Sequence, residues 1–145
     1  MNLIEMFREL GRYNARKLRA EAKDLTGTEI IDREDSVPKF DAEKDYSEWP
    51  LNAPVSDNGQ VWLLLQPHNA AHFPDLKPET NRACWGLAHT KNPEKAKAWV
   101  DAYGTSGMYM TGECYADENG VVYRALTDNL VYNAIDLPSA WEKIV

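Results

Sequence analysis

GQVWLLL (residues 59–65) recurs as GVVYRAL (residues 120–126). Both stretches begin at the glycine of an Asn-Gly pair, place an aromatic residue three positions later and end on a leucine after three more. An Asn-Gly pair favours the tight turn of a β-hairpin, and apolar residues that alternate after it are typical of a strand with one inward face. The repeat therefore predicts a mainly β chain with two small duplicated antiparallel β modules.

A proline and then a tryptophan follow each stretch: Pro78 and Trp85 after the first, Pro138 and Trp141 after the second. The closing tryptophan comes 23 residues after the aromatic of the first copy but 18 residues after that of the second, so the two intervening loops differ in length. Two arrangements fit this pattern: two separate modules, or two hairpins of one sheet whose aromatic residues fill its core.

Composition excludes several classes of protein. The 145 residues suffice for one domain or two very small ones. The net charge of −7 argues against nucleic acid as a partner, because phosphate binding needs clustered lysine and arginine. No apolar run approaches the roughly 20 residues that span a bilayer, and the charged N-terminus does not resemble a signal peptide. We expect synthesis in the cytoplasm, no membrane partner, and reduced Cys84 and Cys114.

Residues 1–27 form the first predicted unit, an amphipathic helix for attachment or oligomerisation. Its apolar residues recur at threes and fours, and Gly27 is a plausible stop. Residues 1–25 hold six basic and four acidic residues, a net of +2, which leaves −9 for the remainder. Packing on its own body or self-association fits this helix better than binding to a membrane surface. The apolar positions are Leu3, Phe7, Leu10, Ala15, Leu18, Ala22 and Leu25.

The rest of the chain divides into three parts. Residues 28–45 form an acidic connector whose charge and lack of periodicity favour an extended or loosely ordered segment. The first β module covers residues 46–90. Residues 91–145 hold a short joining helix, capped at Asn92 and running to Trp99, and the second module.

Five motif positions of the second copy resemble the small carbohydrate-binding modules of chitinases, the family 5/12 type. They are an early Trp99, a Tyr-x-x-Gly step at residues 109–112, a Gly-x-x-Tyr strand at residues 120–123, and the closing Pro138 and Trp141. The first copy, from Tyr46 to Trp85, resembles a degenerate version with a longer loop. Similar modules recur in proteins encoded near tail-fibre and baseplate genes of phages and prophages of Gram-positive bacteria, and the whole layout resembles those proteins.

Two departures from this family argue against chitin itself. Family members that bind chitin carry paired tryptophans near the last strand, whereas residues 139–142 contain Trp141 alone. The usual His-Thr-Ser ending is replaced in the first copy by residues 68–70, which read His-Asn-Ala. These departures do not exclude the binding of another glycan.

The resemblance implies a non-catalytic phage virion protein, of the tail fibre, baseplate or particle surface, that binds a host cell-wall or surface glycan. Sugar rings stack on aromatic side chains, so the candidate binding residues are Trp62, His68, Trp85, Tyr103, Tyr109 and Tyr132. Of these we expect Trp62, Tyr103, Tyr109 and Tyr132 to be exposed. The resemblance gives Trp99, Tyr123 and Trp141 structural roles in the core of the modules.

The alternative is a structural, assembly or fibre-chaperone component of the virion that binds no glycan. In either case we expect the helix to contact other virion proteins or to form a homo-oligomer, for example a trimer. His68 and His72 have a metal-binding spacing, but neighbouring prolines place them in a loop without a third ligand. Glycoside hydrolysis needs two carboxylates that face the scissile bond. The acidic groups Asp32/Glu34/Asp35 and Asp117/Glu118 lie in the connector and in a turn, where acids ordinarily face solvent. We therefore expect no enzyme activity, no metal and no cofactor.

Overall fold

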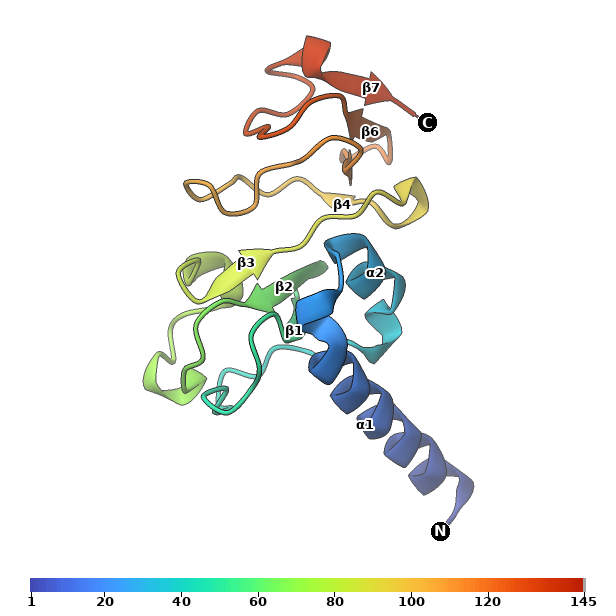
Figure 1. Cartoon of the computed structure of the whole chain (residues 1–145), viewed down its shortest axis with the longest axis vertical. Coiled ribbons are helices and arrows are strands. Elements are labelled where there is room, and N and C mark those ends of the chain that lie inside the picture. Colours follow the sequence, from blue (N-terminus) through green and yellow to red (C-terminus); the bar gives the residue numbers. More distant parts are fainter. Residues whose placement is uncertain (145) are drawn as a thin grey trace.

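The computed structural model describes residues 1–144 and shows an elongated molecule (Figure 1). An N-terminal helix, α1 (Leu3–Glu21), projects at one end, and two small β-sheets follow along the long axis. The predicted class, mainly β with an N-terminal helix and two mostly antiparallel modules, is confirmed. The repeats form two sheets, so the alternative of one continuous sheet is wrong.

The first sheet has three antiparallel strands in the order β1-β2-β3. Asn58 and Gly59 form the turn between β1 and β2 with positive φ angles of 51° and 75°, as expected for an Asn-Gly hairpin. The strands are β1 (Pro54–Asp57), β2 (Gln60–Leu64) and β3 (Trp85–Leu87), and the 3₁₀ turns of the long loop are η3 (Ala70–His72) and η4 (Pro78–Thr80).

The second sheet repeats this plan with one strand more, in the order β4-β5-β6-β7. The additional strand β4 runs parallel to β5, and the other pairings are antiparallel. Each module thus contains a hairpin, a 3₁₀ turn that starts at proline, and a closing strand that starts at tryptophan. The bounds are β4 (Lys97–Ala98), β5 (Cys114–Ala116), β6 (Val122–Ala125), η6 (Pro138–Ala140) and β7 (Trp141–Lys143).

Gly27 does not stop the N-terminal helix but begins a second one. The first helix ends earlier, as α1 followed by η1 (Ala22–Asp24), and Thr26 then caps α2 (Gly27–Asp32). A side chain at position 27 would bring its Cβ to 2.5 Å from the carbonyl oxygen of His89, so any other residue would force the backbone here to shift.

The expectation of an extended or loosely ordered connector is wrong for residues 28–36, which are mostly helical, whereas residues 37–45 contain no helix. Ile30 and Ile31 of α2 are fully buried and pack with Leu18 of α1. After η2 (Glu34–Ser36), Lys39 forms a parallel bridge with Ser56 of β1. Two adjacent isoleucines among charged residues supply the burial that makes this short helix stable.

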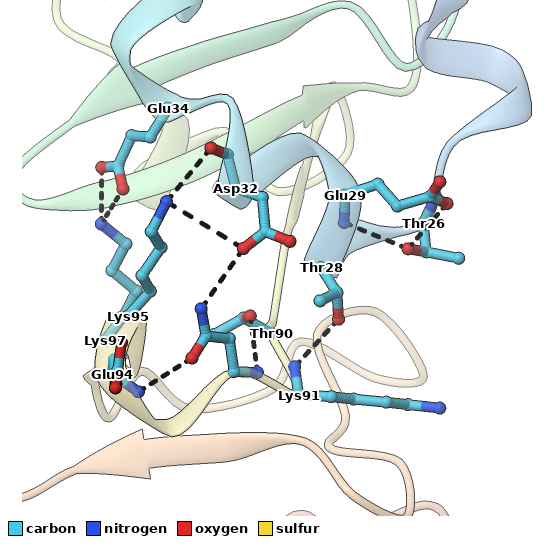
Figure 2. A network of polar contacts seen from close by, with 11 residues as sticks. Thr26, Thr28, Glu29, Asp32, Glu34, Thr90, Lys91, Glu94, Lys95 and Lys97 are labelled. Atoms are coloured by element: carbon cyan, nitrogen blue, oxygen red, sulfur yellow. Dashed lines mark hydrogen bonds and ion pairs between the residues drawn. The ribbon is translucent and has the colours of Figure 1, made fainter.

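A polar network fastens this connector to the chain between the modules (Figure 2). The Thr28 hydroxyl accepts the backbone N–H of Lys91 at 2.9 Å, and the Lys97 ammonium lies 2.6 Å from a carboxylate oxygen of Glu34. Lys95 donates to the backbone carbonyl of Asp32 at 3.1 Å. The joining helix itself is shorter than expected: it consists of η5 (Pro93–Lys95), capped by Asn92, and the chain is extended again at Lys97.

Candidate functional site

Each module is built around three aromatic rings that are arranged alike. The first set is Phe40, Tyr46 and Trp85, and the second is Trp99, Tyr109 and Trp141. In both sets the tyrosine meets the tryptophan of the closing strand edge to face, at centroid distances of 5.2 and 5.4 Å. The remaining ring stacks on the tyrosine with interplanar angles of 11° and 10°. The duplication therefore extends from the sequence to the geometry of the cores.

This arrangement buries three of the predicted glycan-binding residues. Trp85 is fully buried, and Trp62 and Tyr109 are each only 1% exposed. The expected exposure of Trp62 and Tyr109 is wrong. The Arg82 guanidinium lies over the Trp62 ring at 5.2 Å, and Tyr109 stacks on His89 at 3.6 Å. None of the three buried rings offers a free face to a sugar.

The other three candidates lie in three different loops. Tyr103 and Tyr132 are exposed, as predicted, by 62% and 58%, in the loops after β4 and after β6. His68 is half-buried at the edge of the first core, 5.6 Å from the Trp85 ring, and its Nδ1 lies 2.8 Å from the carbonyl oxygen of Gln66. No aromatic platform forms from the predicted set.

A groove of about 300 Å³ instead opens on the second module. It lies beside the parallel pair β4 and β5 and the tip of the hairpin between β5 and β6. Aromatic rings, acidic groups, one amide and aliphatic side chains meet there. The lining includes Trp99, Tyr115, Tyr123, Asp117, Glu118, Asn133 and Ile135.

The aromatic wall of this groove is held rigidly. The Trp99 indole donates its N–H to Asp101 at 2.7 Å and meets the Tyr115 ring edge to face at 5.1 Å. Tyr123 stacks on Tyr115 at 5.4 Å. The Tyr115 hydroxyl accepts the backbone N–H of Ala134 at 2.9 Å, which fixes the loop that forms the opposite wall. Trp99 and Tyr123 are half-buried and can present part of their rings to a ligand.

The polar groups of the groove include carboxylates, which accept hydrogen bonds, and an amide and phenols, which can donate them. Asp117 accepts two backbone N–H groups of the hairpin turn at 2.9 Å each, so its position is fixed, while Glu118 is exposed at the tip. Asn133 turns its amide oxygen to the backbone of Ile135 at 3.0 Å, which leaves the amide nitrogen as the donor for a ligand. Burial raises the pKa of Tyr115, and the nearby carboxylates of Asp117 and Asp136 raise it further. The groove therefore has a neutral phenol and a negative rim.

The matching hollow of the first module has a different lining. It measures about 410 Å³ and contains the charged residues Glu34 and Lys39 beside a single aromatic ring, that of Phe40. Trp62, which corresponds to Tyr123, lies beneath Arg82, and this arginine donates to the backbone carbonyl of Asp101 at 2.9 Å. Arg82 of the first module thus covers the Trp62 ring, and the start of the second module holds this arginine through the Asp101 carbonyl. Of these two matching hollows in the described part of the chain, the one on the second module has the aromatic wall.

A further hollow lies at the junction of the two modules and contains His89 and Glu113. Burial lowers the pKa of His89 to about 4, so the ring is neutral at neutral pH. Its Nε2 lies 2.8 Å from the carbonyl oxygen of Gly107, which can only accept, so Nε2 carries the proton. Burial also raises the pKa of Glu113, whose carboxylate accepts the Met110 backbone N–H at 2.7 Å. Both side chains therefore take part in the packing between the two modules.

Sequence reasoning missed Tyr115, Asp117 and Asn133 as lining residues and assigned Trp99 and Tyr123 to the core. Trp99 does belong to the core, but one side of it also reaches the groove. A signal for Tyr123 was present in the repeat, because this position aligns with Trp62 but has the charged neighbour Arg124 in place of an apolar one.

No protein-family model and no curated protein matches this chain. In residues 1–144 no helix is long and apolar enough to cross a membrane. The same part of the chain contains no group of three or more side chains placed to hold a metal ion, and His72 lies 3.4 Å from the Asn69 amide.

Proposed function

We propose that this chain is a non-catalytic glycan-binding protein and that the groove of the second module receives the sugar. The observation that carries the proposal is the meeting of Trp99, Tyr115 and Tyr123 with the side chains of Asp117 and Asn133 in one groove. The apolar C–H face of a pyranose ring can rest on the aromatic wall, while the carboxylate and amide groups hydrogen-bond its hydroxyls.

The charge of the groove narrows the kind of sugar. Asp117 and Glu118 line it, and Asp136 lies close enough to raise the pKa of Tyr115. Binding an anionic sugar would bring like charges together. A neutral or amine-bearing polysaccharide therefore fits better than an acidic one.

The biological setting rests on the resemblance alone. The motif positions around Trp99 and Trp141, with the N-terminal helix and the repeated module, favour a virion protein of a phage or prophage that contacts the host cell wall. The alternative is an assembly or chaperone component without glycan binding. It is favoured by the burial of Trp62, Trp85 and Tyr109 and by the exposed apolar helix.

Retention on insoluble polysaccharides tests the proposal. The wild type is incubated with cellulose, chitin, chitosan and Gram-positive cell walls, beside Tyr123→Ala, Asn133→Ala and the matched control Tyr132→Ala. Tyr132 is an exposed tyrosine outside the groove. We expect affinity for the matrix to fall about fivefold for Tyr123→Ala and to be unchanged for Tyr132→Ala, because stacking on a ring contributes about 1 kcal/mol.

Circular dichroism establishes that the variants fold. Equal retention of Tyr123→Ala and wild type would remove the groove from the binding site. Failure of the wild type to bind any of the matrices would leave the assembly role as the better account.

A further inference from the structure

The first half of α1 carries an uncovered row of apolar side chains, which we call the apolar stripe. Its members recur at threes and fours, so they share one face of the helix. Each is between 53% and 65% exposed. The stripe consists of Leu3, Met6, Phe7, Leu10 and Tyr13.

The helix contacts the body only at its other end. Leu18 and Ala22 are fully buried, whereas residues 1–13 are all exposed. Figure 1 shows α1 projecting away from the sheets. The eleven helical residues among them, 3–13, extend about 16 Å, and a helix of that length is marginal in water without a partner. Contiguous exposed apolar surface of this kind marks an interaction site.

The charges beside the stripe indicate what covers it. Glu5, Glu9, Arg12 and Arg16 form a row along the polar side of the helix, with both acids nearer the N-terminus, and Arg12 also pairs with Glu9 within the chain. Such a row is complementary to a copy of itself that runs in the opposite direction. An acidic partner would meet two carboxylates in this row, and membrane-surface helices carry tryptophan and a uniformly basic flank.

We propose that the apolar stripe binds the same stripe of a second copy of this chain, with the two helices antiparallel. The acids of one copy then lie beside the bases of the other, and antiparallel helix dipoles add a favourable contribution. The second module lies at the far end of the molecule from α1 (Figure 1). The pair therefore carries one groove at each end.

Self-association rests on α1 alone, but its consequence for glycan binding rests on the proposed function. Because the matching hollow of the first module contains a single aromatic ring, we assign one site to each chain, and two sites on one assembly then require two chains. Linked weak sites bind a polymer far more tightly than either site alone. Two grooves that face away from each other also bridge two polysaccharide chains.

Mass measurement by light scattering during size-exclusion chromatography tests the pairing. We expect the wild type at twice 16.5 kDa at tens of micromolar, Leu10→Lys as a monomer, and the control Leu51→Lys still as a dimer. Leu51 is an equally exposed leucine on the body of the molecule. A monomeric wild type would overturn the proposal, as would capture of the monomer by phosphatidylglycerol vesicles.

Charge-reversal variants test whether the charged row of α1 contributes to the pairing. Glu9→Arg makes the row mainly basic and the double variant Arg12→Glu/Arg16→Glu makes it fully acidic, so each alone should dimerise at least tenfold more weakly. An equimolar mixture should form the mixed dimer. Cross-linking of Leu3→Cys to itself on oxidation would require parallel helices and would overturn the antiparallel arrangement.

Discussion

The buried ring of His89 makes the stability of the protein depend on pH. Its pKa is about 4 in the folded state, because burial disfavours the charged form and Arg82 adds repulsion, against 6.5 for the ordinary group. The unfolded chain therefore binds the proton first as pH falls. The contribution of His89 is complete above pH 6.5 and is lost between pH 6.5 and 4, by roughly 3 kcal/mol in all.

Urea unfolding at pH 7 and pH 4.5 measures this effect. His89→Gln should be less stable than wild type at pH 7, because it loses the stacking on Tyr109, but its loss between the two pH values should be smaller. Carboxylates titrate in both proteins, so their contribution to the pH dependence cancels when the two losses are compared. Equal losses in the two proteins would show that His89 does not couple folding to pH.

Gly27 and Gly11 should respond oppositely to the same substitution. Gly27→Ala places a Cβ 2.5 Å from a backbone carbonyl and should lower the free energy of unfolding by about 1–3 kcal/mol. Nothing lies within 4 Å of a Cβ at Gly11, so Gly11→Ala should increase the helicity of α1. Thermal unfolding and circular dichroism check both, and a neutral Gly27→Ala would contradict the close packing of α2 against residue 89.

Among the elements, those with a local signature were predicted and those that depend on distant partners were not. The Asn-Gly turn at residues 58–59 and the helical periodicity of α1 can each be recognised from residues that are neighbours in the sequence. By contrast, α2 has six residues, too few to show a period, and it is stable because Ile30 and Ile31 are buried. The two-residue strand β4 exists through its pairing with β5, which lies more than a dozen residues away.

The ion pair between η2 and β4 should contribute to the stability of the join between connector and modules. Glu34 and Lys97 have side chains only 32% and 17% exposed, and they lie within hydrogen-bond distance. Glu34→Ala should lower the free energy of unfolding by about 1 kcal/mol, less at high salt. Chemical denaturation of Glu34→Ala measures this loss of stability, and the exposed Glu48→Ala is the control. Equal effects of the two variants would contradict a role for the pair.

For the whole molecule, the candidate site was predictable as a kind of site but not as a set of residues. Aromatic richness indicated sugar stacking, yet the six predicted residues are buried or scattered. Which aromatic face is open depends on contacts between residues far apart in the sequence: Arg82 covers Trp62, and the Asp101 carbonyl of the second module accepts a hydrogen bond from Arg82. The groove also combines Trp99, Tyr123 and Asn133 from separate loops and strands, and no local spacing specifies their meeting.

The polar network between α2 and residues 90–97 holds the two ends of the molecule at a fixed distance. With Lys91, Lys95 and Lys97 all tied to the connector, the helix and the far groove keep a fixed separation. In the proposed pair, the span between the two grooves is then set by the fold and not by a flexible tether. Polymers whose strands lie at that span are held together at high effective concentration, and those at other spacings engage one groove at a time.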